Sequence, residues 1–231
     1  MKKILITGAS KGIGKATALK LLNENYKVVG LSRTHSIKDK NYTPIKQDLN
    51  TIDQVAKCMD SILKENRSIE AFISVAGEGI FENLENFSDK TIKDYFNLNL
   101  LSHLIISKKL VSFFKKKKKG YFIFIGSEAA LNGGEKGTLY TTAKHGLFGF
   151  VKSLKLECNR NNIRVTIINS GMVRTKFFKN LKFKPGKRKE NAISVNDIAS
   201  LISYLLSTSK YINISEINIS PLKKVIDFKK K

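Results

Sequence analysis

Short apolar runs alternate along the chain with longer stretches in which apolar residues recur every three or four positions. Several of the short runs are hydrophobic nearly throughout, which is typical of strands covered by helices on both faces. We expect seven strands, at residues 3–7, 27–31, 43–46, 70–74, 120–126, 164–169 and 216–219. The longer stretches have helical spacing. They predict helices at residues 13–25, 51–66, 90–114, 140–161 and 195–206.

This alternation of strands and helices predicts an α/β fold with one doubly wound parallel sheet and helices on both faces. No repeat, low-complexity linker or glycine- and proline-rich boundary divides the sequence, and 231 residues suit one domain with a full core. We therefore expect a single domain over residues 1–231. Sheets of this kind bind ligands beyond the carboxyl ends of their strands, so the chemistry is expected just after the strands.

The composition adds one unusual feature, a formal net charge of +23 from 42 Lys and Arg against 19 Asp and Glu. Such a charge alone suggests an acidic partner, such as a nucleic acid or a membrane. However, 36 of the cations are Lys and only 6 are Arg, and the chain also holds 26 Ile and 19 Asn. This composition indicates an AT-rich genome, whereas Arg is the usual choice for phosphate recognition. We favour a coding bias and expect neither nucleic acid nor membrane as a partner.

The cellular location follows from what the sequence lacks. No run approaches the roughly 20 apolar residues that cross a bilayer. The apolar run at residues 4–6 is shorter than the roughly 7 to 15 residues of a signal-peptide core. Cys58 and Cys158 have neither metal-ligand spacing nor a disulfide framework. We therefore expect a cytoplasmic protein without a metal site.

A glycine-rich loop follows the first predicted strand directly and leads into the first predicted helix. It reads Thr7-Gly8-Ala9-Ser10-Lys11-Gly12-Ile13-Gly14. Its glycines permit a tight turn and a close approach of backbone to a pyrophosphate, whose charge a helix N-terminus stabilises. Glycines also make ordinary turns, but the position at the first strand-to-helix junction favours dinucleotide binding.

A possible acid/base group lies farther along the chain. Tyr140 and Lys144 are four residues apart, so they share one face of a predicted helix. A free tyrosine has a pKa near 10, and we expect the neighbouring cation to lower the pKa of Tyr140 by favouring phenolate. Such pairs also occur by chance. Ser127, immediately after a predicted buried strand, strengthens the interpretation because its hydroxyl can hydrogen-bond a substrate oxygen while Tyr140 transfers the proton.

The glycine loop, with its Gly-x-x-x-Gly-x-Gly spacing after Thr7, resembles the short-chain dehydrogenase/reductase family, and so do Ser127, Tyr140 and Lys144. The resemblance spans residues 3 to about 207. It implies a Rossmann fold and reversible hydride transfer between a nicotinamide cofactor and a ketone or secondary alcohol. Ser127 would position the carbonyl, Tyr140 would be the acid in reduction, and Lys144 would hold the ribose. It also implies a homodimer or homotetramer formed through the helices at 90–114 and 140–161.

The same resemblance implies further site residues. Asn99 matches the fourth catalytic residue of the family, which helps to hold a water; Asn97 competes for this role by composition. Asp48 would meet the adenine ring, and the Val173 backbone and Thr175 would bind the nicotinamide end. The cofactor site implied by the resemblance comprises Gly8, Ser10, Lys11, Gly12, Ile13, Gly14, Ser32, Arg33, Asp48, Leu49, Ala76, Gly77, Tyr140, Lys144, Gly171, Val173 and Thr175.

Two stretches depart from the family pattern. Ser74 and Val75 stand where the family carries two asparagines, and Ser170 replaces a proline, which we expect to loosen a rigid turn. These departures leave open an alternative function, a cofactor-binding regulator or pseudoenzyme of the same fold.

The cofactor is predicted from the end of the second strand. NAD-dependent enzymes usually carry a carboxylate there that binds the ribose 2′-hydroxyl. Here the strand ends in Gly30-Leu31-Ser32-Arg33, without an acid. Arg33 and Lys11 can pair with a 2′-phosphate, so NADP(H) is favoured over NAD(H).

The resemblance also implies that residues 176–192, which follow the segment at the nicotinamide end, form a lid over the substrate. They mix Phe177, Phe178 and Phe183 with many lysines. One interpretation is an apolar lid whose basic rim attracts an anionic carbonyl or alcohol substrate. The other is coding bias on an exposed loop.

Overall fold

A parallel sheet forms the centre of the computed structural model, which describes residues 1–229. Its seven strands run in the order β3-β2-β1-β4-β5-β6-β8, and every neighbouring pair is parallel. The strands are β1 (Lys3–Thr7), β2 (Lys27–Ser32), β3 (Tyr42–Lys46), β4 (Ile69–Ser74), β5 (Gly120–Ile125), β6 (Ile163–Ser170) and β8 (Glu216–Ile219). The predicted doubly wound sheet is confirmed. Each predicted strand is present, with bounds that differ by no more than one residue at either end.

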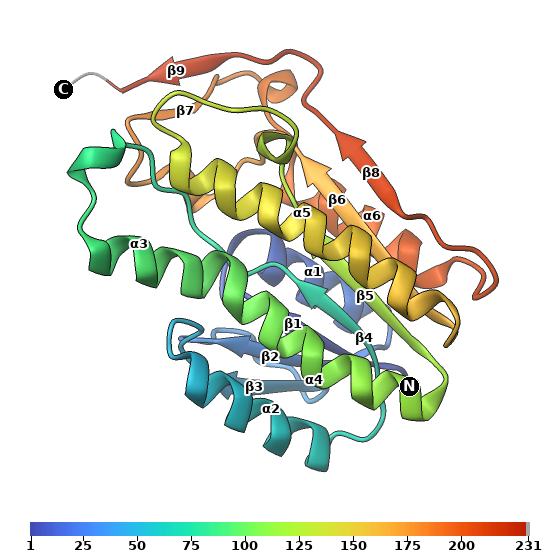
Figure 1. The fold of residues 1–231 in the computed structure, drawn as a ribbon. Coiled ribbons are helices and arrows are strands. Elements are labelled where there is room, and N and C mark those ends of the chain that lie inside the picture. Colours follow the sequence, from blue (N-terminus) through green and yellow to red (C-terminus); the bar gives the residue numbers. More distant parts are fainter. Residues whose placement is uncertain (230–231) are drawn as a thin grey trace.

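Helices cover both faces of the sheet. On one face lie α2 (Ile52–Glu65), α4 (Ser102–Lys117) and α5 (Thr138–Asn159), and on the other lie α1 (Gly12–Asn23) and α6 (Val195–Ser207) (Figure 1). Successive strand residues point to opposite faces. Phe72 and Phe122 therefore join the core beneath α2, α4 and α5, whereas Ile73 and Ile123 join the core beneath α1 and α6. This double burial explains why the strands are apolar throughout.

The helix predicted at residues 90–114 is interrupted, and that prediction is wrong in this respect. It consists of α3 (Asp89–Phe96), a π-helical turn (Asn97–Leu101) and α4. Side chains compete for the backbone carbonyls here. Asn99 Nδ2 donates to the Tyr95 carbonyl at 3.0 Å and Ser102 Oγ donates to the Leu98 carbonyl at 2.8 Å. Turns of this kind often mark functional sites.

The segment after β6 contains structure that the pattern did not predict. A 3-10 turn (Lys176–Phe178) precedes β7 (Phe183–Pro185), which pairs antiparallel with β9 (Ile226–Phe228). Figure 1 shows β9 running alongside β7, apart from the main sheet. The Nζ of Lys229, just after β9, donates to the carbonyls of Phe178 and Lys179 at 2.6 and 2.7 Å. The C-terminal segment therefore fastens residues 176–186 to the domain.

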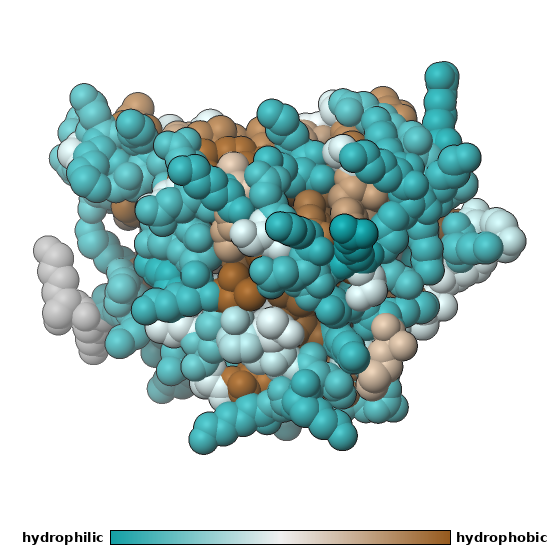
Figure 2. All heavy atoms as spheres, turned by 90° about the horizontal axis from the view of Figure 1, so that it is seen from below, coloured by the Kyte–Doolittle hydropathy of each residue, from teal (hydrophilic) through white to brown (hydrophobic). Residues whose placement is uncertain are grey.

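One face of the molecule is mainly polar. Figure 2 shows hydrophilic side chains over most of this face, with apolar groups visible between them. Within residues 1–229, no helix is long and apolar enough to cross a membrane. Most of the buried apolar residues belong to the two cores, one on each face of the sheet, as expected for a sheet buried between helices.

Candidate active site

Three polar side chains meet where β5 ends beside the first turns of α5. Ser127 follows β5 and caps a 3-10 turn (Glu128–Ala130) by accepting a hydrogen bond from the Ala129 amide at 3.2 Å. Tyr140 and Lys144 lie four residues apart on α5 and share a face. Ser127, Tyr140 and Lys144 all line one cavity of about 610 Å³. The arrangement expected of an acid/base pair with a carbonyl-binding hydroxyl is therefore present.

Lys144 is buried against the end of β5. Its Nζ donates to the Ile125 carbonyl at 3.2 Å and lies 5.9 Å from the centroid of the Tyr140 ring. Burial lowers the pKa of Lys144 to about 8, because the ammonium loses its hydration. The side chain is thus still mostly protonated at neutral pH, close to the phenol and to the floor of the cavity.

The pKa of Tyr140 moves in the direction opposite to the one predicted. Burial raises it, a hydrogen bond with Ser127 lowers it, and the nearby Glu128 carboxylate raises it again. The prediction that Lys144 lowers the pKa counted the neighbouring charge but not the desolvation of the phenol. Burial therefore favours the protonated phenol, the form that can donate a proton.

Asn99 lies in the π-helical turn, 1% exposed, and lines the same cavity. Its Oδ1 accepts a hydrogen bond from the Glu78 amide at 2.9 Å, and its Nδ2 is bonded to Tyr95 as described above. Asn97, the competing candidate, donates to the Asn50 carbonyl at 3.3 Å and is not among the residues that line the cavity. The geometry therefore favours Asn99 as the asparagine of the site.

A second hollow, of about 280 Å³, runs along the carboxyl ends of the strands into this cavity. The loops after β1, β2, β3, β4 and β6 all contribute to it. It is lined by twelve of the predicted cofactor residues, namely Gly8, Ser10, Lys11, Gly12, Ile13, Ser32, Arg33, Asp48, Leu49, Ala76, Gly77 and Thr175. Gly171 and Val173 line the larger cavity instead. We call the second hollow the nucleotide groove.

The glycine loop has the backbone that its sequence demands. Gly8 and Gly12 have φ angles of +70° and +57°, a region that side chains disfavour. Gly14 lines neither hollow, and a Cβ on it would lie 2.3 Å from the Gly8 carbonyl oxygen. Thr7, for which the sequence pattern predicts no separate role, accepts hydrogen bonds from the Val75 and Ala76 amides at 3.0 and 3.3 Å. It thereby joins the loops after β1 and β4.

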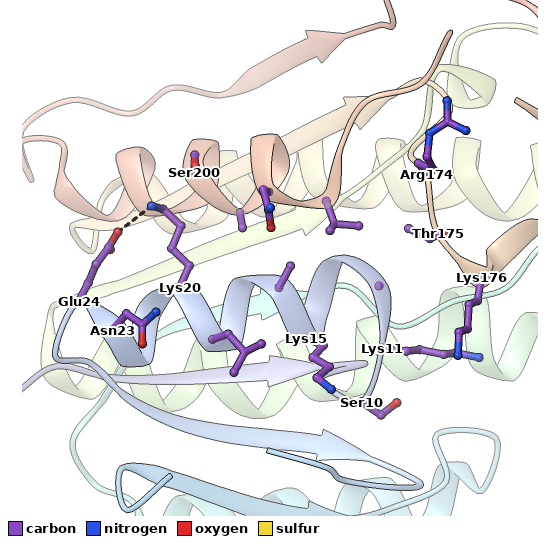
Figure 3. Close-up of a pocket in the computed structure, with 16 residues that line it drawn as sticks. Ser10, Lys11, Lys15, Lys20, Asn23, Glu24, Arg174, Thr175, Lys176 and Ser200 are labelled. Carbon is purple, nitrogen blue, oxygen red and sulfur yellow. Dashed lines mark ion pairs between the residues drawn. The ribbon is translucent and has the colours of Figure 1, made fainter. Parts of the chain in front are cut away.

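Cations gather beside this loop. Lys11 and Lys176 both line the nucleotide groove. They also line a neighbouring pocket beside α1 and α6, and Figure 3, which draws that pocket, shows the two side chains extending toward the same side of it. Arg33 lines the groove at the end of β2, after the buried Ser32, whose Oγ has no hydrogen-bond partner among residues 1–229. These groups and the N-terminus of α1 fit a ligand with several phosphates. Lys176 was predicted to lie on the lid rim, and nothing in the local pattern placed it here.

The two departures from the family pattern have structural partners. Ser74 is buried, and its Oγ lies 2.5 Å from Nδ1 of His103 on α4. Ser170 belongs to β6 and is paired in register with Ile219, and the following Gly171 amide donates to the Ile219 carbonyl at 2.8 Å. The expected loosening is therefore wrong, because the strand ladder holds this position. Within residues 1–229, no cluster of His, Cys, Asp or Glu could hold a metal ion.

Comparison with known proteins identifies the family that this chain resembles. The family model described as short chain dehydrogenase matches residues 2–185. A 3-oxoacyl-(acyl-carrier-protein) reductase from Buchnera aphidicola subsp. Schizaphis graminum is 30% identical over 233 residues, covering 95% of this chain and 96% of that protein. An alcohol dehydrogenase from the archaeon Thermococcus sibiricus, complexed with 5-hydroxy-NADP, has a TM-score of 0.86 at 24% identity and covers 97% of this chain and 99% of its own. A 4-hydroxyisoleucine dehydrogenase complexed with NADH has a TM-score of 0.85 at 25% identity, covering 96% and 98%.

Proposed function

This chain belongs to the short-chain dehydrogenase family, whose members are oxidoreductases of alcohol and ketone groups with a nicotinamide cofactor, and we propose that it interconverts a ketone and a secondary alcohol with NADP(H). Ser127, Tyr140 and Lys144 are the proposed catalytic residues, with Asn99 in support.

One observation carries the proposal: the nucleotide groove opens into the cavity that holds these catalytic side chains. Ile13, Val75, Gly77 and Thr175 line both hollows. A dinucleotide whose phosphates lie beside the glycine loop can therefore extend toward Tyr140. When bound, its nicotinamide would supply or accept the hydride.

The side chains handle the proton. Tyr140 donates it to the carbonyl oxygen during reduction, and the raised pKa keeps the phenol protonated for this step. Ser127 Oγ donates a hydrogen bond to the same oxygen and fixes its position. Lys144, held by the Ile125 carbonyl, stands beside the phenol with its ammonium ready to bind a ribose hydroxyl. Asn99 fixes the Glu78 backbone and the turn that forms one wall of the cavity.

The preference for NADP(H) rests on the end of β2. Arg33 is exposed and lines the nucleotide groove, as does Lys11, and no carboxylate follows β2 directly. A 2′-phosphate would gain charge-assisted hydrogen bonds here. Arg33→Ala should weaken NADPH binding by roughly 1.5 to 3 kcal/mol and leave NADH binding nearly unchanged. Equal kcat/KM for NADPH and NADH in the unaltered enzyme would contradict this preference.

We also propose a cytoplasmic homodimer or homotetramer built on α4 and α5. Leu101, next to α4, is 41% exposed, and Leu156 on α5 is 72% exposed. Exposed leucines on these adjacent helices suit burial against a second copy. Sedimentation analysis of the unaltered chain and of Leu156→Glu tests the assembly. A monomeric unaltered chain would contradict it.

Residues 176–192 are the proposed substrate lid.

Tyr140→Phe tests the catalytic assignment. It removes the transferable proton and little else, so turnover of a ketone panel with NADPH should fall at least a hundredfold, while NADPH binding stays within a few-fold. Tyr204→Phe, an exposed tyrosine on α6, is the matched control and should retain full activity. If Tyr140→Phe kept a tenth of the activity, Tyr140 would not be the acid. If the unaltered protein bound NADPH but turned over no carbonyl, the regulator alternative would be supported.

A further inference from the structure

Phenylalanine rings wall the part of the cavity that extends beyond Tyr140. The Phe81 ring lies 5.2 Å, centroid to centroid, from the Tyr140 ring and 5.0 Å from the Phe183 ring. Phe177 lies 6.0 Å from the Tyr140 ring, and Phe178 lies 6.0 Å from Phe183. All four phenylalanines line the cavity, so a substrate whose carbonyl reaches Tyr140 must lie against an apolar wall.

Three features of the fold hold the phenylalanine wall in place. Thr175 caps the turn Lys176–Phe178 by accepting a hydrogen bond from the Phe177 amide at 3.1 Å, which turns the phenylalanines inward. Gly79 makes room for them, since a Cβ there would lie 2.3 Å from Cζ of Phe177. The pairing of β7 with β9 then fixes Phe183 and adds Ile226 to the wall.

The cations of the lid lie elsewhere. Side chains alternate along β7, so Phe183 faces the cavity and Lys184 is exposed. Of the described residues 176–192, no Lys or Arg lines the cavity; Lys176 lines the nucleotide groove instead. The side of the proposed lid that faces the cavity is therefore apolar, and the side that faces away from it is basic.

The charged side chains that line the cavity are equal in number and opposite in sign. They are two carboxylates, Glu78 and Glu128, and two ammonium groups, Lys144 and Lys224. Lys224, from the C-terminal segment, is already paired with Glu128 at 2.6 Å. Glu128 directly follows Ser127, and its ion pair with Lys224 leaves no net positive charge beside the carbonyl-binding hydroxyl that could attract a carboxylate. Among the described residues that line the cavity, the buried Lys144 is therefore the one cation without an ion-pair partner, although the chain carries a net charge of +23.

From this distribution we infer that the substrate is a neutral carbonyl compound or alcohol whose bulky apolar group packs against Phe81, Phe177, Phe178 and Phe183. The inference rests on the proposed function and narrows it to a substrate class. Apart from Lys176 at the nucleotide groove, the lysines of residues 176–192 are exposed and do not select a carboxylate.

A matched pair of probes tests the substrate class: ethyl benzoylacetate, which is neutral, and benzoylacetate, its carboxylate. Both are assayed by NADPH oxidation at saturating cofactor and low ionic strength. The ester should have a kcat/KM at least about tenfold higher, the factor expected from excluding a charge from a site without a free partner. Higher efficiency with the carboxylate, or with a 3-oxobutanoyl group on an acidic acyl carrier protein, would overturn the inference while leaving the proposed function intact.

Variants of the wall identify where the preference arises. Phe183→Ala should lower kcat/KM for the ester about tenfold, the equivalent of losing much of one buried aromatic contact, with butan-2-one affected less than twofold. Phe183→Leu should recover most of the loss, which separates packing from misfolding, and Lys184→Gln is the matched control with unchanged efficiency. Equal losses for ester and butan-2-one would refute a substrate contact at Phe183. Absence of turnover with every probe and either cofactor would instead refute the proposed function, and the inference with it.

Discussion

Replacing His103 with Asn measures how firmly the fold holds a histidine in its neutral form. His103 is fully buried on α4; Nδ1 lies beside Ser74 Oγ, and Nε2 has no hydrogen-bond partner among the described residues. Burial, and then the charge of Lys144, lower the pKa of His103 to about 3. In the unfolded chain the pKa is about 6.5. The unfolded chain therefore takes up a proton at a higher pH than the folded one does.

The sign and size of the effect follow from this difference. The stability linked to His103 is fully present above about pH 6.5 and is lost progressively as the pH falls toward 3. Between pH 7 and pH 5 this single group should lower the free energy of unfolding by about 2 kcal/mol. Asn keeps a polar atom that can face Ser74 but does not titrate, so its unfolding free energy should lack this contribution.

Urea unfolding followed by far-UV circular dichroism at pH 7, 6 and 5 provides the assay for both proteins. Any pH-independent effect of the substitution on the free energy of unfolding cancels, because only the change of that free energy with pH is compared. The unaltered protein should lose about 2 kcal/mol more than His103→Asn over this range. Parallel curves would show that His103 titrates in the folded protein as it does in the unfolded chain, and the reasoning from burial would fail.

Three further outcomes are expected. Glu128→Gln removes a carboxylate that raises the pKa of Tyr140, so the pH profile of alcohol oxidation, which needs the phenolate, should move to lower pH; a profile that stays or rises would exclude this electrostatic effect. Gly14→Ala forces the glycine loop to shift and should weaken NADPH binding at least about tenfold in a fluorescence titration, whereas Gly149→Ala, with open space around it, should not. Ser194→Ala breaks the capping box with Asp197 and should cost about 1 kcal/mol in urea unfolding, and the exposed Ser200→Ala on the same helix serves as its control.

Local pattern was sufficient for most of the fold. Runs of apolar residues mark strands buried on both faces, so all seven strands of the sheet were predictable. The glycine loop and the Tyr140–Lys144 pair were also predictable, since a turn needs particular backbone angles and a helix brings residues four apart together. These features depend on neighbours within a few positions, and the sequence displays those neighbours directly.

The remaining features depend on residues far apart in the chain. Only the tertiary structure decided that β7 pairs with β9, that Lys176 joins Lys11 at the nucleotide groove, and that the lid turns its phenylalanines inward. It also reversed the sign of the pKa shift of Tyr140, because burial is a property of the packed fold. By itself, then, the sequence determined the sheet and the placement of Tyr140 and Lys144 on one helix face, whereas packing between distant segments decided the environment of these two side chains.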